Sequence, residues 1–428
     1  MHPLPQQTSP QRNGRARNQP IPHPSCHREK ISASTQNQAL SAILFLYRHV
    51  LHIELDEASL SEFRPQRAKT VPTVMSKDEV KRVFENMTGI YKLIAQVMYG
   101  LPLIGSGDWN DGFNRVGSQG KGESTWLTWF LIDVLKRFAE VCDQRDLLEE
   151  AEAYREQANA YIKAVEEYAW DGDWYLRAYY DDGTALGSHR SEECQIDAIA
   201  QSWSVLSGAG DRKRSESSMN VVWERLTDTN NNLSLLFSPP FDKTSDNPGY
   251  IKDYPPGVRE NGGQYTHAAA WTAWAYAGLG DSARAWHLFD ILNPIYQADS
   301  EKRATQYRVE PYISAADVYS QGSQLRRGGW TWYTGSAGWL YRLGIEQLLG
   351  LHRENNILHL NPIIPARWDG FKMQYRYLDT EYRIQVWNPE HVSHNVREIR
   401  FDGNVVDGKN IFLPNDGFSH GIEIMMGI

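Results

Sequence analysis

Between residues 125 and 349 the sequence alternates long stretches of helical periodicity with loops rich in Gly, Trp, Tyr and Asp. This alternation limits the fold more than any other feature. Apolar residues recur at helical spacing in seven stretches, which predicts helices over Thr125–Cys142, Leu147–Trp170, Cys194–Leu206, Ser215–Thr227, Tyr265–Leu279, Ser282–Leu292 and Gly335–Leu349. Paired helices with chemistry in the intervening loops indicate an α-helical toroid or barrel. The predicted fold class is therefore mainly α.

The end of the chain follows a different pattern. From Ile357 the apolar period changes to two, which is typical of strands. Short antiparallel strands are predicted over 375–377, 382–386 and 411–413. We therefore expect a helical domain over residues 101–350, followed by a small C-terminal β-domain over residues 351–428.

The first 100 residues differ from the rest. Residues 1–27 are rich in Pro, Gln, Ser and Arg and contain no apolar run, so they predict a disordered tail rather than a signal peptide. Residues 28–100 predict a small helical domain, with helices over 34–51, from 76 to about 87 and from about 91 to 99. The pattern changes abruptly at Gly100-Leu101-Pro102.

Charge and composition restrict the kind of ligand. Residues 1–100 carry 13 Lys and Arg against 8 Asp and Glu, whereas the remainder carries 31 against 45. An acidic body with 15 Trp in the whole chain argues against broad nucleic-acid binding there and fits a neutral, hydroxyl-rich ligand. Cys26, Cys142 and Cys194 have no metal-ligand spacing and predict a reducing compartment. No stretch reaches the roughly 18 to 20 apolar residues of a membrane span, so a cytoplasmic protein is predicted.

The segment Asp108-Trp109-Asn110-Asp111-Gly112-Phe113-Asn114 contains the groups that a sugar-cleaving site needs. An acid protonates the glycosidic oxygen, an aromatic ring stacks on the sugar, and short polar groups bind its hydroxyls. Asp108 is accordingly a candidate for sugar binding. Asp and Asn are also ordinary turn residues, which is the alternative interpretation.

Two further segments combine polar residues with a predicted helix start. Residues 258–267, Val-Arg-Glu-Asn-Gly-Gly-Gln-Tyr-Thr-His, precede an apolar helix whose first N–H groups favour an anion. In residues 330–339, Thr334 is a good N-cap, and Gly335 and Ser336 expose backbone N–H groups that suit a phosphate or sulfate. A capped loop with a hydrogen-bonded His267 in the first segment, and helix capping with close packing in the second, are the alternatives.

A fourth set of polar residues lies on or just before one predicted helix. Asp197 and Gln201 are four residues apart and share a face, so they are candidates for contact with a sugar, together with Glu192. A solvated or capping role is the alternative for Glu192.

Residues 101–428 resemble the C-terminal part of inverting glycoside phosphorylases (glycoside hydrolase family 94). This group includes cellobiose and chitobiose phosphorylases and the phosphorylase-like end of cyclic β-1,2-glucan synthases. The resemblance lies in residues 107–112, 259–267 and 332–335, while Glu310-Pro311-Tyr312 and residues 328–332 are most similar to the glucan-synthase branch.

The resemblance implies a partial (α/α)6 barrel before the β-domain and an inverting phosphorolysis of a β-glucoside to α-glucose 1-phosphate. It implies Asp111 as the general acid, Trp109 beside the donor sugar and Glu260 as a sugar contact. It also implies that His267, Thr334 and Gly335 hold phosphate. Phosphate is itself a nucleophile and needs only positioning, so inorganic phosphate is the expected co-substrate, and no cofactor or metal is expected.

The sequence departs from the family before residue 108. Such enzymes carry an N-terminal β-sandwich and the first barrel helices there, and cellobiose phosphorylases often have Gln at the position of Ala316. Half a barrel leaves apolar helix faces uncovered. An active enzyme and a chain inactivated by truncation therefore both stay open, as do a homo-oligomer and a partner chain that completes the barrel.

Residues 28–100 have a resemblance of their own. Residues 32–48 are similar to the SAM-like core-binding domain of integron-type tyrosine recombinases, and residues 71–100 resemble the opening of their catalytic domain, ending before the first catalytic Arg. The alternative function is therefore a non-catalytic DNA-binding fragment, whose basic residues are Arg48, Arg64, Arg67, Lys69, Lys81 and Arg82. A solvated basic face is the other interpretation. The chain resembles a fusion near residue 100, either a rearranged gene or an assembly artefact.

Overall fold

The computed structural model describes residues 101–104, 108–332, 335–406 and 410–428. All of these belong to one of two units of the chain, Asn86–Ile428. The predicted tail, the predicted helices of residues 28–100 and their basic residues lie outside the described residues, and so does Thr334.

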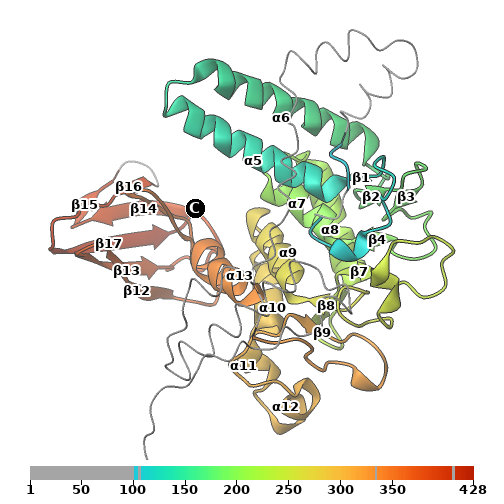
Figure 1. The fold of residues 1–428 in the computed structure, drawn as a ribbon. Coiled ribbons are helices and arrows are strands. Elements are labelled where there is room, and N and C mark those ends of the chain that lie inside the picture. Colours follow the sequence, from blue (N-terminus) through green and yellow to red (C-terminus); the bar gives the residue numbers. More distant parts are fainter. Residues whose placement is uncertain (1–100, 105–107, 333–334, 407–409) are drawn as a thin grey trace, which may run out of the picture. The chain divides into compact units, whose positions relative to one another are not determined.

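The helices follow the predicted order (Figure 1). They begin with a long pair, α5 and α6, and the apolar helix α9 contacts α7, α10 and α13. Ten of the 13 residues of α9 are buried, and six of these are Ala, which lets neighbouring helices approach closely. The bounds are α5 Thr125–Asp143, α6 Leu148–Tyr168, α7 Ala198–Leu206, α8 Arg212–Leu226, α9 Thr266–Gly278, α10 Ser282–Leu292, α11 Pro294–Gln297, α12 Glu301–Tyr307 and α13 Ser336–Arg342.

Two predicted helices differ from the structure. In the Cys194–Leu206 stretch, Cys194 has a positive φ and residues 196–197 are extended. The side chain of Asp197 then accepts from the N–H of Ile199 and starts α7. The Gly335–Leu349 stretch is divided into α13 and a π-helical turn, η5 (Leu343–Leu348). The helices α11 and α12 were not predicted.

Short strands occupy the loops between the helices. Three of them, β1, β4 and β8, lie directly before α5, α7 and α9, so pairing with a distant segment fixes where each helix begins. The pairs are β1 (Glu123–Ser124) with β2 (Ala178–Tyr179), β2 with β3 (Ala185–Leu186), β4 (Ile196–Asp197) with β7 (Phe237–Ser238), β5 (Thr227–Asp228) with β6 (Leu233–Ser234), and β8 (Gln264–Tyr265) with β9 (Asp317–Val318). Three 3₁₀ turns complete these loops, η2 (Asp111–Phe113), η3 (Tyr250–Asp253) and η4 (Gly322–Gln324).

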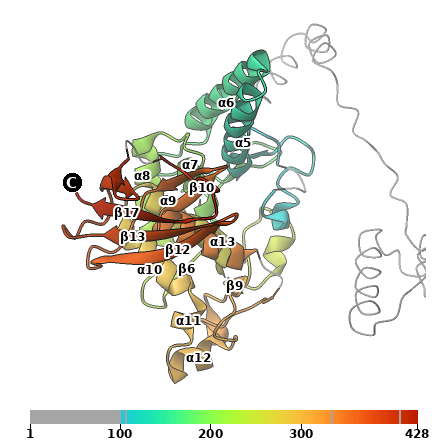
Figure 2. The same cartoon turned by 90° about the vertical axis from the view of Figure 1, so that its left-hand side faces the viewer.

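The C-terminal strands form two sheets (Figure 2). The first has the order β10-β11-β16, with bounds Leu351–Glu354, Ile357–Leu360 and Asn410–Phe412. The second has the order β12-β13-β17-β14-β15, with bounds Gly370–Tyr377, Thr380–Trp387, Ser419–Met426, Val396–Phe401 and Asn404–Val405. The rings of Trp286 on α10 and Trp368 lie 5.0 Å apart and connect this part to the helices.

The predicted fold class is corrected, and one strand pairing was not foreseen. The described residues form a mixed helix and sheet structure rather than a mainly α one, because short ladders fill the loops and the C-terminal part has eight strands. The predicted strands, found in β12, β13 and β16, do form antiparallel pairs, β12 with β13 and β11 with β16. β13 also pairs in parallel with β17, which was not predicted, with Ile384 opposite Ile422. Buried and more exposed residues alternate along β13, as they would beside either a parallel or an antiparallel neighbour. The local sequence therefore does not determine the partner strand.

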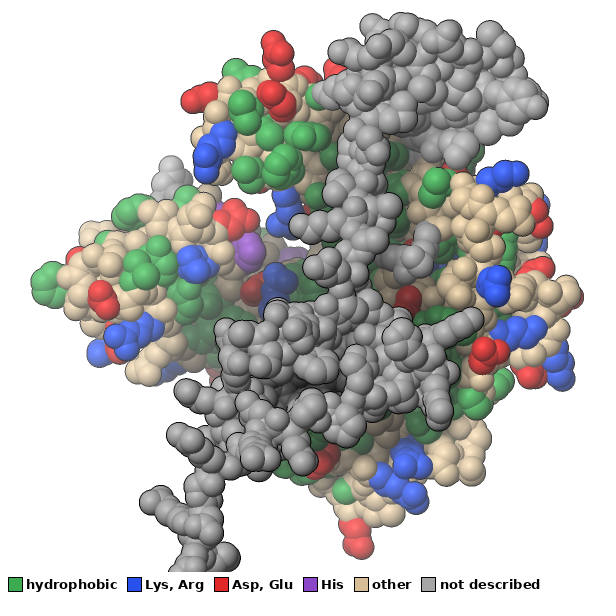
Figure 3. Space-filling model, in the orientation of Figure 1, with side chains coloured by type: hydrophobic (Ala, Val, Ile, Leu, Met, Phe, Trp, Pro, Cys, Tyr) green, Lys and Arg blue, Asp and Glu red, His purple; other side chains and the backbone are tan. Residues whose placement is uncertain are grey.

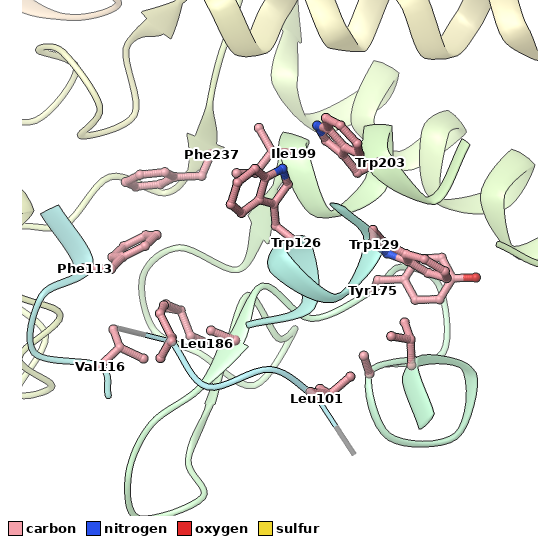
Figure 4. Close-up of a cluster of buried hydrophobic side chains, with 14 of the residues drawn as sticks. Leu101, Phe113, Val116, Trp126, Trp129, Tyr175, Leu186, Ile199, Trp203 and Phe237 are labelled. Atoms are coloured by element: carbon pink, nitrogen blue, oxygen red, sulfur yellow. The ribbon is translucent and has the colours of Figure 1, made fainter. Parts of the chain in front are cut away.

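Aromatic side chains form much of the helical core (Figure 4). Trp126 on α5 packs against Trp203 on α7 and Trp271 on α9, with ring centroids 6.2 and 6.4 Å apart. Phe113, which follows the Asp-Trp-Asn-Asp segment, packs against Phe237 at 6.4 Å. The segment is therefore anchored directly to the core.

One face of α5 is apolar and exposed. Phe130, Val134 and Phe138 recur every four residues along the helix, and Leu148 at the start of α6 is 65% exposed. Figure 3 shows apolar side chains gathered over this helix pair.

Candidate active site

The Asp108–Asn114 segment presents one carboxylate to solvent. Asn110 caps the turn η2 by accepting from the N–H of Gly112 at 3.1 Å, and Asp111 is the first residue of that turn. A Cβ at Gly112 would lie 2.9 Å from both Asn110 Oδ1 and Ile251 Cβ, so only glycine fits this close approach. Asp111 is exposed, as a proton donor to a bound substrate must be.

Two tyrosines flank Asp111. The hydroxyl of Tyr250 donates to the Asp111 carboxylate, and burial together with this bond raises the pKa of Tyr250. The ring of Tyr254 lies 6.2 Å from that of Tyr250, and the charges of Asp111 and Glu260 both act on Tyr254. The predicted acid and the predicted sugar contact Glu260 thus share a neighbourhood.

Trp109 connects the acid segment to the start of α9. Its indole Nε1 donates to Nδ1 of His267 at 3.4 Å. Its ring also meets Tyr265 edge-on at 5.2 Å. Segments 108–111 and 259–267, more than 140 residues apart in sequence, therefore meet at one place.

His267 is held as a neutral donor. Burial lowers its pKa to about 4, so the ring is uncharged at neutral pH. Because Nδ1 accepts from Trp109, the ring proton is on Nε2. Nε2 is buried and has no hydrogen-bond partner among the described residues. The ring stacks on Trp339 at 5.5 Å, which fixes its orientation.

A cavity of about 240 Å³ lies beside this imidazole. It brings residues of the second and third segments together, since both His267 and Gly335 line it. Its other lining residues are Arg259, Tyr265, Ala316, Asp317, Trp330 and Ser336. Asp111 does not line the cavity but is connected to it through Trp109 and its bond to His267.

Glu260 does not line the cavity but interacts with two residues that do, Arg259 and Tyr265. Burial raises its pKa, and the hydroxyl of Tyr265 donates to it. Arg259 Nε lies 3.4 Å from Glu260 Oε2, and the Arg259 guanidinium stacks 4.9 Å over the ring of Tyr254. Arg259 has φ 52°, a left-handed backbone that a non-glycine residue adopts only when its surroundings require it. The sequence prediction did not single out Arg259, Tyr250 or Tyr254.

Three predicted sugar contacts have buried side chains. Asp108 is ion-paired with the buried Arg177 and accepts from the hydroxyl of Ser124 at 2.7 Å. Asp197 Oδ2 lies 3.5 Å from Arg177 Nε, and burial raises the pKa of Asp197 to about 6 although Arg177 opposes this. Gln201 accepts from the N–H of Tyr175 at 2.8 Å.

None of these three lines the cavity, and their side chains are engaged in internal bonds. The structure therefore points to a supporting role for Asp108, Asp197 and Gln201, and their contact with a sugar stays a prediction. Glu192 is exposed.

Neither a metal site nor a membrane span is found in the described part of the chain. No cluster of three or more His, Cys, Asp or Glu side chains there could hold a metal ion. None of the described helices has both the length and the apolar composition needed to cross a membrane.

An exposed carboxylate beside aromatic rings and a polar cavity is the arrangement of a carbohydrate-active protein. Residues 58–350 match the Glycosyl hydrolase 94 superfamily, catalytic domain, and the chain belongs to this family. The predicted relationship to glycoside phosphorylases is thus confirmed. The match begins at residue 58, earlier than the predicted start at residue 101.

Individual relatives agree with the family. The chain is similar to the cyclic β-(1,2)-glucan synthase NdvB of Rhizobium meliloti (strain 1021), at 48% identity over 311 residues, which are 72% of the chain and 11% of that protein. It is also similar to the N,N'-diacetylchitobiose phosphorylase of Vibrio furnissii, at 32% identity over 325 residues, which are 75% of the chain and 39% of that enzyme. These relatives support a glycoside phosphorylase type of function. The chain spans well under half of each of them.

The chain also has a shorter similarity to a recombinase. An integrase/recombinase of Escherichia coli is 42% identical over 72 residues, which are 17% of the chain and 21% of that protein.

Proposed function

We propose that the protein catalyses inverting phosphorolysis of a β-1,2-linked glucoside to α-glucose 1-phosphate. The observation that carries the proposal is the Trp109–His267 bond, which joins the segment of the exposed carboxylate to a polar cavity suited to an oxyanion. The 48% identity to a protein named cyclic β-(1,2)-glucan synthase favours the β-1,2 linkage.

The proposed reaction needs an acid, Asp111, and a nucleophile, the bound phosphate. Asp111 gives its proton to the glycosidic oxygen as the bond from that oxygen to the anomeric carbon breaks, and the oxygen keeps the electron pair. A phosphate oxygen attacks the anomeric carbon from the opposite face and forms the new C–O bond, so a β-linkage yields an α-phosphate. Phosphate replaces the activated water of a hydrolase, so no second catalytic carboxylate is required.

The remaining roles follow from position. The Nε2–H of His267 and the backbone N–H of Gly335, together with Thr334, would bind phosphate. Trp109 and Glu260 would contact the donor sugar. We further propose that the helices are part of an (α/α)6 barrel and that the protein acts in the cytoplasm. An inactive chain is the alternative to the active enzyme.

The test is direct. The protein is incubated with inorganic phosphate and β-1,2-gluco-oligosaccharides, and glucose 1-phosphate is measured. Asp111→Asn is expected to lower the rate by about 10²- to 10⁴-fold, whereas Asp242→Asn, at another exposed carboxylate, leaves it unchanged. A folded protein that releases no product from any β-glucoside contradicts the proposal.

A second candidate function is DNA binding through residues 28–100, favoured by the recombinase relative. Displacing counterions makes such binding depend on salt, with a slope in log–log form of about −0.9 for each phosphate contacted. A gel shift over a salt series measures the slope, and replacing Arg64, Arg67 and Lys69 by Ala should reduce it. No shift at low salt, or a slope near zero, excludes DNA binding.

A further inference from the structure

Asp317 is a buried carboxylate that belongs to none of the segments discussed so far. It lies on β9, directly opposite Tyr265 of β8, and the residue is 1% exposed. Oδ1 accepts from the backbone N–H of Trp330 at 2.9 Å, and the backbone N–H of Arg259 also approaches the carboxylate. One side chain thus binds the loop before α9 to the loop before α13.

The second oxygen of this carboxylate is unsatisfied. Oδ2 is buried and makes no hydrogen bond within the described residues. A Cβ added at Gly329 would lie 2.4 Å from both carboxylate oxygens, so the backbone packs tightly on that side. The carboxylate also lines the cavity that His267 and Gly335 share. A buried polar atom without a partner costs free energy, which a ligand with a hydrogen to donate would recover.

The surroundings of the cavity indicate which ligand this is. Two of the cavity's lining residues, His267 through Nε2–H and Arg259 through its guanidinium, offer hydrogens and not lone pairs, and the charge of Arg259 also acts on the Asp317 carboxylate. The second proton of a phosphoryl group dissociates at about pH 6. Inorganic phosphate has a third proton, which dissociates only in strongly alkaline solution, so HPO₄²⁻ still carries a P–OH at neutral pH. Sulfate has no such proton, so it would present only oxygen lone pairs to a carboxylate.

We propose that Oδ2 of Asp317 accepts a hydrogen bond from the P–OH of bound phosphate and so makes the cavity select hydrogen phosphate over sulfate. This inference rests on the proposed function, since it places phosphate beside His267 and Gly335. Asp317 is then a specificity-determining residue of the phosphate site. Burial raises the pKa of its carboxyl group, because the ionised form has lost its hydration. A hydrogen bond from P–OH would stabilise the ionised form in place of that water.

The test compares anions on the full-length protein by calorimetry at pH 7, without sugar. Arsenate has the geometry of phosphate and also retains a proton. We expect phosphate and arsenate to bind within about threefold of one another and sulfate to bind at least about tenfold more weakly, the difference that one hydrogen bond to a charged group makes.

The variant Asp317→Asn keeps an oxygen for the Trp330 N–H but puts an N–H donor in place of the acceptor. It should bind phosphate about tenfold more weakly and sulfate more tightly, so that the selectivity disappears. The matched control is Asp290→Asn, which also removes a carboxylate whose pKa is raised by burial, but one that does not line this cavity. It should keep the wild-type ratio of phosphate to sulfate affinity.

The outcomes separate the two proposals. Equal binding of sulfate and phosphate by the wild type, or an unchanged ratio in a folded Asp317→Asn variant, overturns the role of Asp317. The same holds if the variant loses affinity only for a glucoside, since Oδ2 would then accept from a sugar hydroxyl. If Asp317→Asn does not fold, the wild-type comparison of arsenate with sulfate decides. Selective phosphate binding without glucose 1-phosphate formation supports the role of Asp317 and contradicts the proposed function.

Discussion

The indole Nε1 of Trp109 and the imidazole Nδ1 of His267 are joined by a hydrogen bond of 3.4 Å between segments 158 residues apart. The bond determines which nitrogen of the histidine carries the proton. With Nδ1 occupied as an acceptor, Nε2 becomes the donor beside the cavity. The ring would otherwise be free to present a lone pair to an anion.

Trp109→Phe is therefore expected to raise the KM for phosphate by about tenfold, because the ring contact is kept while the bond that sets the tautomer is lost. Steady-state rates at saturating glucoside measure this effect. Trp286→Phe is the control, since it removes an indole bond to the carbonyl of Ile363 and Trp286 does not line the cavity. An equal change of KM in both variants would show that the effect is a general loss of packing.

The burial of His267 makes stability depend on pH. Its folded pKa of about 4 lies below the ordinary value of 6.5, so the unfolded chain takes up a proton first as the pH falls. The free energy of unfolding should then decrease below pH 6.5, and the contribution of His267 at pH 5 is roughly 2 kcal/mol. His267→Gln should lose less stability between pH 7.5 and pH 5 than the wild type does, as measured by urea unfolding. Parallel losses in the two proteins would contradict this assignment.

Local signals in the sequence predict the helices well. The bounds of α10 agree with the structure, and α5 begins at the predicted Thr125, because periodicity and capping act over a few neighbouring residues. The failures are non-local. The parallel pairing of β13 with β17 and the two-residue strands before α7 and α9 depend on segments that are distant in sequence.

The candidate site shows the same division. Residue types identified Trp109, His267 and Gly335, and the structure brings these together at or beside one cavity. The sequence could not show that Asp108 is paired with Arg177, 69 residues away, because a carboxylate in a loop has the same local pattern whether it faces a ligand or the core. Asp317 was missed for the same reason.

Replacing Arg177 should change the free energy of unfolding, because Arg177 is the ion-pair partner of Asp108. Its side chain is fully buried between Asp108 and Asp197, so Arg177→Met would leave two carboxylates without a counter-charge. We expect a loss of about 3 to 5 kcal/mol in the free energy of unfolding at pH 7. Arg137→Met breaks an exposed ion pair with Asp133 and should cost less than about 1 kcal/mol. The free energies of unfolding of both variants are measured with urea. Similar decreases in the two variants would contradict a supporting role of Arg177 and its two carboxylate partners.

Glu123, on β1, should make stability depend on pH in the opposite direction from His267. Burial raises the pKa of this half-buried carboxyl group to about 7 from 4.5, so the folded protein resists its ionisation. As the pH rises, Glu123 ionises above about pH 4.5 in the unfolded chain but only near pH 7 in the folded protein. The wild type therefore loses stability over this range, and the loss is complete above pH 7. Glu123→Gln removes this cost and should stabilise the protein at pH 8 by about 1 kcal/mol, a value reduced for the part of the group that water still screens. At pH 4 both forms are neutral and the difference should vanish, so thermal melts at pH 4 and pH 8 test the sign directly. A gain of the same size at both pH values would mean that better packing of the amide, and not the charge of Glu123, accounts for it.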